Sequence, residues 1–278
     1  MVRRRDPAQR LVAMTTATRP ELPLANLRDL GGIRVAEGCV RSGRVFRSDD
    51  VAVIDRDGAE QLLASGVTTI LDLRSTIELE RWGRGHLGDL GTAHVLLPLQ
   101  RIPSAPHELR IGLPLEAVTP ESMGRWYVEM VLDAADLLVE GLRVTADADG
   151  AVLFHCAAGK DRTGVFAAAL LAVLGADAAA IAADYTLTQT QLRPLLTRLS
   201  VVFPTDDQNF AGFDWDNPPG AMLSAPSETM LAMLRILDEE HGGMLSVLRR
   251  AGLDAITEAT LRERLVDGST TNSEGVSA

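Results

Sequence analysis

Short apolar runs and longer stretches with helical periodicity alternate along most of the chain. Four short runs predict strands at 44–48, 67–74, 94–99 and 151–156. Several of these runs are continuously apolar, which is typical of strands that are covered on both faces of a sheet. The pattern therefore predicts an α/β fold with a layered core.

Helical stretches separate these runs, and several carry clear start and stop signals. Thr119 is an N-cap residue before Pro120, and the apolar residues that follow recur at helical spacing as far as Leu138. Residues 162–174 are almost wholly apolar and stop at Gly175, the pattern of a buried helix with a glycine C-cap. Further helices are predicted from Asp177 toward Leu192 and at about 227–240, 244–251 and 254–265.

Both ends of the chain and two internal segments lack such periodicity. We expect residues 1–20 to form a disordered arm and residues 267–278 to form a disordered tail. A single domain is therefore expected over 21–266. The segments 101–118 and 199–226 carry many prolines and glycines. Long irregular segments of this kind are often lids over a site, but they can also be covering loops packed by their aromatic residues. Both interpretations fit the sequence.

Composition and charge narrow the class of protein. The 278 residues include 27 basic and 38 acidic side chains, and the resulting net charge of −11 argues against nucleic-acid binding and stable membrane residence. No apolar run reaches the roughly 20 residues that a membrane-spanning helix needs, and no secretory leader opens the chain. We expect a protein that is cytoplasmic or exported without a cleaved signal peptide. Its oligomeric state does not follow from composition.

Two cysteines, Cys39 and Cys156, are too few for a disulfide framework. Cys39 follows a glycine in a loop-like stretch and is expected to be inert. The histidines lack the spacing of metal ligands, so we expect neither a metal site nor a cofactor. Any cysteine chemistry therefore falls to Cys156.

Cys156 lies in the segment HCAAGKDRTG, where a predicted strand passes through a tight loop into the buried helix. Arg162 follows the cysteine by six residues, so its guanidinium can fold back and bind two oxygens of a phosphoryl group. The positive end of the helix would stabilise both this anion and a nucleophilic thiolate. The residues expected to bind phosphate are Ala157, Ala158, Gly159, Lys160, Asp161 and Arg162. A cysteine that merely packs beside a helix start would not explain its neighbours.

Those neighbours suggest supporting roles. His155 is expected to bond to backbone and hold the loop, because its side chain points away from that of Cys156. Gly159 permits a left-handed backbone, and Thr163 offers its hydroxyl to the cysteine sulfur. Lys160 adds a second cation at the rim, which favours a doubly charged phosphate or a polyphosphorylated substrate.

Hydrolysis of a phosphomonoester also needs a proton donor for the leaving oxygen. Asp161 lies inside the loop and is the slightly favoured candidate, while Asp72 ends a strand at the same sheet edge and is the alternative. Asp72 could instead be a structural partner of Arg74. Arg47 and Arg74 could attract an anionic substrate or pair with acidic neighbours.

The loop resembles the signature of cysteine-dependent phosphatases, in particular the bacterial protein-tyrosine phosphatase B-type family. Further landmarks of that family, in the same order, are Asn26–Gly32, Arg44–Ser48, Leu71–Ser75 and Asp184-Tyr185, so that the resemblance spans about residues 24–265. Ala157 stands where a larger residue is expected, and His241-Gly242 where an aromatic-glycine pair is usual. Neither departure touches the nucleophile or the arginine.

The resemblance implies a phosphatase fold, with a parallel-rich central sheet between helices and helical or loop lid insertions. It also implies metal-free hydrolysis through a phosphocysteine. The leading hypothesis is a protein-tyrosine phosphatase acting on phosphotyrosine-containing proteins, and the first alternative is a dual-specificity or phosphoinositide phosphatase. A non-catalytic phosphate-binding module and a sulfurtransferase fit the residues less well, because cysteine and arginine are both intact and Thr163 suits phosphoryl chemistry.

Overall fold

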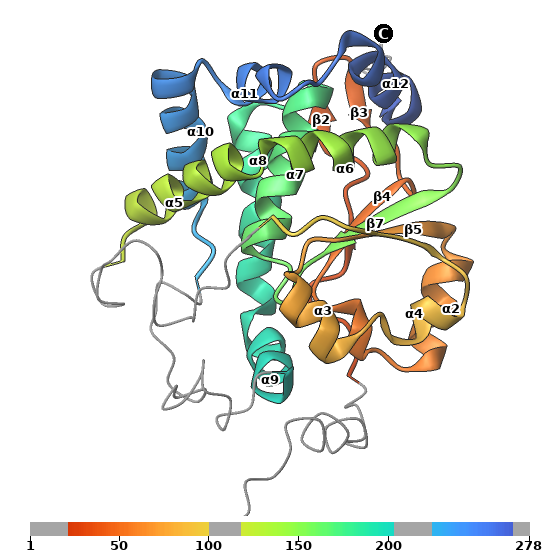
Figure 1. The fold of residues 1–278 in the computed structure, drawn as a ribbon. Coiled ribbons are helices and arrows are strands. Elements are labelled where there is room, and N and C mark those ends of the chain that lie inside the picture. The colour runs from red at the N-terminus through yellow and green to blue at the C-terminus, as the bar shows by residue number, and fades with distance from the viewer. Residues whose placement is uncertain (1–21, 100–117, 203–223, 269–278) are drawn as a thin grey trace, which may run out of the picture.

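The computed structural model of the protein describes three stretches of the chain, residues 22–99, 118–202 and 224–268 (Figure 1). The predicted arm at 1–20 lies outside the described residues. So do nearly all of the predicted lid segments and all but the first two residues of the predicted tail.

The central sheet has five strands. Their spatial order is β1 (Arg28–Asp29), β4 (Val45–Ser48), β7 (Ala151–His155), β5 (Val67–Asp72) and β6 (Ala93–Leu96). β4, β7, β5 and β6 run parallel, and only the short β1 is antiparallel, to β4. The four strands expected from the apolar runs are all present, and the parallel-rich sheet is confirmed.

β5 ends at Asp72 rather than at residue 74, as the apolar run suggested. The Asp72 side chain accepts a hydrogen bond from the backbone N–H of Arg74 at 3.0 Å, which turns the chain out of the sheet. A polar residue at the end of an apolar run thus decides where this strand stops.

A second, three-stranded sheet joins the two ends of the domain. It consists of β2 (Arg34–Val35), β3 (Gly38–Val40) and β8 (Val266–Asp267), all antiparallel. Asp267 pairs with Cys39, so its assignment to a disordered tail was wrong. Strands of two or three residues are too short to show a periodicity, and tertiary pairing alone defines them.

Helices cover both faces of the central sheet, as expected from the resemblance (Figure 1). On one face lie three helices that the sequence analysis did not predict: α2 (Arg56–Ala64), α3 (Thr76–Trp82) and α4 (Gly85–Asp89). They enclose a small core in which Leu62 and Leu87 pack toward Ile70 and Leu153 of the sheet.

The larger core lies on the other face. Its helices are α5 (Pro120–Asp133), α6 (Ala135–Asp147), α7 (Asp161–Leu174), α8 (Ala178–Thr186), α10 (Ser227–His241), α11 (Met244–Arg250) and α12 (Ala255–Leu265). A further helix, α9 (Leu192–Val202), contributes none of its described side chains to this core cluster. α7 is buried almost along its whole length and ends at Gly175 in a left-handed conformation, as predicted. This packing fixes the helix whose first turn meets the phosphate loop.

Two helical segments differ from the prediction. The helix that starts at Pro120 breaks at Ala134, so that α5 packs against α10 while α6 packs against α12. The helix capped by Asp177 ends at Thr186 and continues through a 3₁₀ turn, Leu187–Gln191, into α9. Residues 199–202, assigned to an irregular segment, belong to α9.

Among the described residues, no helix combines the length and apolar character needed to cross a lipid bilayer.

Candidate active site

The phosphate loop connects the central strand of the sheet to its most buried helix. β7 ends at His155, residues 156–160 form the loop, and α7 begins at Asp161. Cys156 is only 2% exposed. The parallel strands β4 and β5 end on either side, at Ser48 and Asp72, so the loop lies at the carboxyl edge where ligands bind in open α/β sheets.

A glycine is required at the point where the loop passes the end of β4. Gly159 has φ +66°, the left-handed region that its sequence position predicted. A Cβ atom at this position would lie 2.5 Å from the carbonyl oxygen of Ser48, closer than packed atoms approach. Backbone conformation and backbone contact therefore both exclude a side chain here.

The carbonyl groups of the loop are held from outside. Asn26 donates its side-chain amide to the carbonyls of Ala158 and Gly159 at 3.2 and 2.9 Å, and Arg47 donates to that of Gly159 at 2.8 Å. The carbonyl of Ala157 accepts from the N–H of Asp50 at 3.1 Å. The three successive carbonyl groups thus point toward the end of the sheet. An anion on the opposite side of the loop would not face their negative ends.

Arg47 itself is completely buried and forms an ion pair with Asp184 of α8. Arg28 completes this cluster by donating to the same carboxylate at 2.9 Å. Burial raises the proton affinity of Asp184, but the two guanidinium groups outweigh it and lower its pKa. Of the two roles considered for Arg47, the geometry supports pairing with an acidic neighbour. Arg28 thereby ties β1 to α8.

Arg162 is held by a residue that the sequence analysis missed. The carboxylate of Glu78, on α3, accepts hydrogen bonds from both terminal nitrogens of the Arg162 guanidinium, at 2.6 and 2.9 Å. The same carboxylate accepts from the backbone N–H of Ser75 at 2.8 Å and so closes a capping box at the start of α3. Burial would raise the pKa of Glu78, but Arg162 and the Ser75 bonds lower it to about 2, so it stays ionised.

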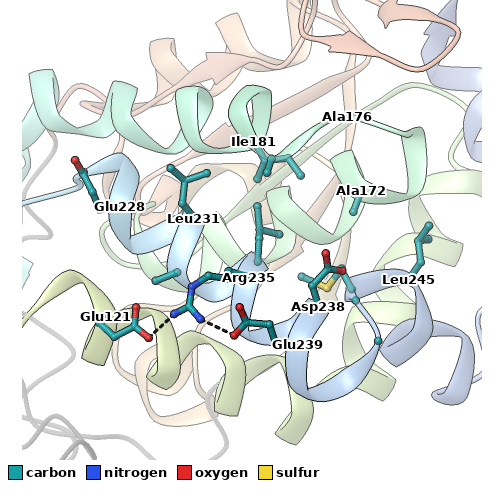
Figure 2. A pocket seen from close by; sticks show the side chains of 16 residues that line it. Glu121, Ala172, Ala176, Ile181, Glu228, Leu231, Arg235, Asp238, Glu239 and Leu245 are labelled. Carbon is teal, nitrogen blue, oxygen red and sulfur yellow. Dashed lines mark hydrogen bonds and ion pairs between the residues drawn. The ribbon is translucent and has the colours of Figure 1, made fainter.

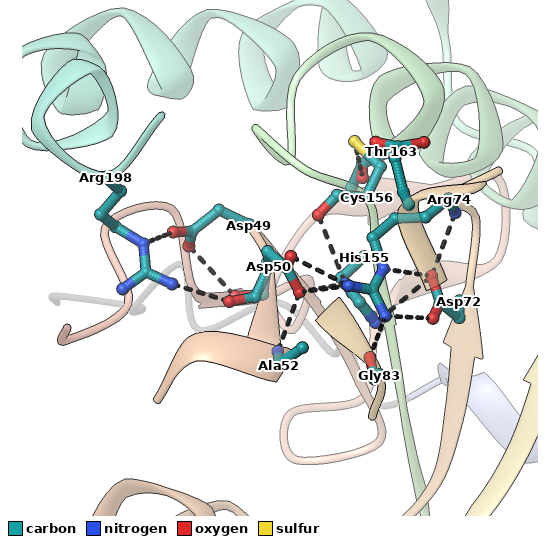
Figure 3. A network of polar contacts seen from close by, with 12 residues as sticks. Asp49, Asp50, Ala52, Asp72, Arg74, Gly83, His155, Cys156, Thr163 and Arg198 are labelled. Atoms are coloured by element: carbon teal, nitrogen blue, oxygen red, sulfur yellow. Dashed lines mark hydrogen bonds and ion pairs between the residues drawn. The ribbon is translucent and has the colours of Figure 1, made fainter. Parts of the chain in front are cut away.

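On the other side of the loop lies a network of buried charges (Figure 3). Arg74 pairs with Asp72 at 2.6 Å and with Asp50 at 3.0 Å, and all three side chains are at most 2% exposed. Burial alone would raise the pKa of Asp72, but His155, Arg74 and His94 lower it strongly. A carboxyl group that is buried, paired and ionised cannot donate a proton at neutral pH. The geometry is therefore against Asp72 as the general acid and against Arg74 as a substrate-attracting cation.

His155 lies within this network rather than in the loop. Its Nδ1 is 3.3 Å from the carbonyl oxygen of Cys156, the backbone contact that the sequence suggested. Burial is the main cause that lowers the pKa of its imidazole, while the carboxylates of Asp72 and Asp50 act in the opposite direction. On the opposite side of the cysteine, the hydroxyl of Thr163 is 3.2 Å from Sγ, the expected contact (Figure 3).

Asp161 differs from Asp72 in its exposure to solvent. Its side chain is 27% exposed, and its Oδ1 accepts a hydrogen bond from the hydroxyl of Tyr127 at 2.5 Å. The Lys160 ammonium lies 3.5 Å from the same oxygen and also donates to the carbonyl of Ser224. Of the two candidate acids, only Asp161 is therefore within reach of solvent.

The network in Figure 3 extends to α9. Arg198 pairs with the fully buried Asp49 and donates to the carbonyl of Asp50 at 2.7 Å. Asp49 in turn accepts from the backbone N–H of Asn26 at 2.9 Å, the residue that holds the loop carbonyls. One arginine of α9 thus supports the back of the phosphate loop.

A hollow of about 880 Å³ lies elsewhere, over α10 and the starts of α8 and α11 (Figure 2). Its floor includes Leu231 and Ile181, and its rim is acidic except for Arg235, which is held between Glu121 and Glu239. It contains none of the residues of the phosphate loop.

Sequence reasoning missed Glu78, Tyr127, Asp50 and Arg198. Each lies far along the chain from the residue that it contacts or from the loop that it supports, so spacing carries no signal for it. Only the capping box formed by Ser75 and Glu78 leaves a local trace, and that trace indicates a helix start rather than a site.

The fold and the loop together define a cysteine-dependent phosphatase: a nucleophilic residue type at the edge of a parallel sheet, at a helix start, six positions before a guanidinium. Residues 22–267 match the model of the tyrosine phosphatase family. The chain therefore belongs to the tyrosine phosphatase family, and it is a hydrolase of phosphoric monoesters.

Individual relatives agree with this assignment. The chain is 30% identical over 271 residues to the triple specificity protein phosphatase PtpB of Mycobacterium tuberculosis, covering 87% of this chain and 97% of that protein. It is 35% identical over 169 residues to a putative tyrosine-protein phosphatase of Cupriavidus necator, covering 58% and 59%. A tyrosine-protein phosphatase of Nostoc commune is 33% identical over 154 residues, covering 55% and 49%. The family predicted from the residues is confirmed.

Proposed function

We propose that this phosphatase removes the phosphoryl group of phosphotyrosine in proteins through a phosphocysteine at Cys156. The observation that carries the proposal is the double support of the loop. Its carbonyls are turned toward Asn26 and Arg47, while Arg162 is oriented by Glu78. The loop N–H groups of residues 157–162 and the guanidinium are then available to hold the phosphoryl oxygens.

In the first step the thiolate of Cys156 attacks phosphorus, and the bond from phosphorus to the tyrosine oxygen breaks. That oxygen takes a proton from Asp161, which lies at the loop rim and is partly exposed. In the second step a water molecule attacks phosphorus, Asp161 takes back a proton, and the sulfur leaves. The hydroxyl of Thr163, 3.2 Å from Sγ, stabilises the departing thiolate.

The assay measures phosphate release from a phosphotyrosine peptide with a metal chelator present, for the wild type and for Cys156→Ser. We expect turnover that survives the chelator and is lost in the variant. Turnover that persists in Cys156→Ser, or that stops with the chelator, would overturn the mechanism.

A wider substrate range is the second candidate, because the Mycobacterium tuberculosis relative is named a triple specificity phosphatase. Lys160 supports it, since a second cation beside Arg162 suits substrates with more than one phosphate. Rates on phosphotyrosine, phosphoserine and a soluble phosphoinositide, measured in parallel, test this range. Lys160→Met is expected to lower the phosphoinositide rate more than the phosphotyrosine rate, and equal losses would argue against the wider range.

A further inference from the structure

Two tyrosines from different helices converge on Asp161. The hydroxyl oxygen of Tyr127, on α5, is 2.5 Å from Oδ1 of Asp161, the first residue of α7. The hydroxyl oxygen of Tyr185, on α8, is 2.8 Å from that of Tyr127. The two rings meet edge to face with centroids 6.1 Å apart, and both side chains are at most 1% exposed.

Counting protons fixes the donor and the acceptor in each of these two hydrogen bonds. A phenol carries one proton, and an ionised carboxylate carries none. Tyr127 must therefore give its proton to Asp161, and its own oxygen accepts the proton of Tyr185. Burial, together with the charge of Asp161, raises the pKa of both phenols well above the usual value, so both remain donors throughout the neutral range.

We propose that Tyr127 is a positioning residue that occupies Oδ1 of Asp161, leaves the exchangeable proton to Oδ2, and sets the pH range of proton transfer, and that Tyr185 supports it by donating to the Tyr127 hydroxyl. The inference rests on the proposed role of Asp161 as general acid. A hydrogen bond donated to a carboxylate favours its charged form. Successive donors polarise one another, so the bond from Tyr127 is strengthened by the bond from Tyr185.

The other charged groups that face Asp161 act in the same direction. The Lys160 ammonium is 3.5 Å from Oδ1, and the Arg162 guanidinium next along the chain interacts electrostatically with Asp161. Neither is altered when a tyrosine hydroxyl is removed. A change in the pH profile of a Tyr→Phe variant can therefore be assigned to the missing hydrogen bond.

The test compares the pH dependence of kcat/KM for the wild type, Tyr127→Phe and Tyr185→Phe, because kcat/KM reports the step in which the acid protonates the leaving group. In Tyr127→Phe the acid keeps its proton to higher pH, so we expect the basic limb to move up by about one pH unit. This is a tenfold change in proton affinity, or about 1.4 kcal/mol. Tyr185→Phe should give a smaller shift of the same sign.

Trp126→Phe is the matched control, because it alters a ring whose centroid is 5.5 Å from that of Tyr127 and removes no hydroxyl group. It should leave the basic limb in place. Asp161→Asn separates the two proposals: it should abolish the limb and slow phenyl phosphate, a poor leaving group, much more than p-nitrophenyl phosphate. In the double variant with Tyr127→Phe no further shift should occur.

If the basic limb of the pH profile stays in place in Tyr127→Phe but is lost in Asp161→Asn, the positioning role of the tyrosines is overturned and Asp161 remains the acid. A limb and leaving-group dependence that persist in Asp161→Asn would overturn both. If Tyr127→Phe does not fold, Tyr185→Phe provides the same test, because the proposal requires this variant to shift the basic limb of the pH profile to higher pH.

Discussion

The ion pair between Glu78 and Arg162 allows a stability change to be worked out before it is measured. Glu78→Gln keeps the shape of the side chain and removes its charge. The pKa of Glu78 falls from 4.5 to about 2 in the folded protein, and at about 1.4 kcal/mol per pKa unit this corresponds to about 3 kcal/mol. The side chain is only 17% exposed, so water screens the pair little.

The sign follows from the lowered pKa. A carboxyl group whose pKa is lower when folded contributes its full stability above the unfolded value of 4.5, and that contribution is lost as the pH falls through about 2. The free energy of unfolding of Glu78→Gln should therefore lie about 3 kcal/mol below the wild type at pH 7. By pH 3 the gap should shrink to less than half. At about 2–4 °C per kcal/mol, the melting temperature at pH 7 should fall by about 6–12 °C.

Urea unfolding of both proteins at pH 7 and pH 3 measures the gap, and other carboxylates cancel in the difference. Activity gives a second readout, because an unanchored Arg162 loses its orientation, and a misplacement of about 1 Å can cost roughly 100-fold in rate. A gap below about 1 kcal/mol at pH 7, or one that does not narrow in acid, would refute the reasoning.

Three further changes test the support of the loop. Thr163→Val removes the hydroxyl that contacts Cys156 Sγ while keeping the volume, so we expect slower hydrolysis of the phosphocysteine, seen as a larger burst before steady state. Gly159→Ala forces a side chain into a left-handed conformation and a backbone contact, and should lower both the melting temperature and turnover. Arg198→Met leaves the buried carboxylate of Asp49 unpaired and should cost about 3–5 kcal/mol in urea unfolding.

Each of these has its own control. Gly32→Ala meets a similar φ of +82° with no atom within 4 Å, so a loss as large as that of Gly159→Ala would show that contact with β4 is unimportant. The double variant of Arg198→Met with Asp49→Asn should recover part of the stability, and full additivity would contradict the pairing. For Thr163→Val, an unchanged burst would remove the hydroxyl from the second step.

The local features of this protein follow from its sequence. The loop and its flanking strand and helix could be read from HCAAGKDRTG, because apolar periodicity, a glycine and the spacing from Cys156 to Arg162 are all properties of neighbouring residues. The parallel-rich α/β fold and the family came from the same local patterns. The three helices on the small-core face were missed because they are short, five to nine residues each, and offer few apolar positions from which to recognise a helix.

The tertiary structure decided which charged side chains can take part in the reaction and which only hold the site in place. Asp72 and Asp161 both occupy a strand or helix end, and nothing in their sequence neighbourhoods separates a buried ion pair from a partly exposed carboxyl group. Their roles diverge because Arg74 folds back onto Asp72, whereas Tyr127, 34 positions away in the chain, reaches Asp161. Desolvation and pairing depend on distances between segments that are remote in sequence. The sequence by itself therefore determined the nucleophile and its loop, and only the folded chain determined how the surrounding carboxylates and arginines are partnered.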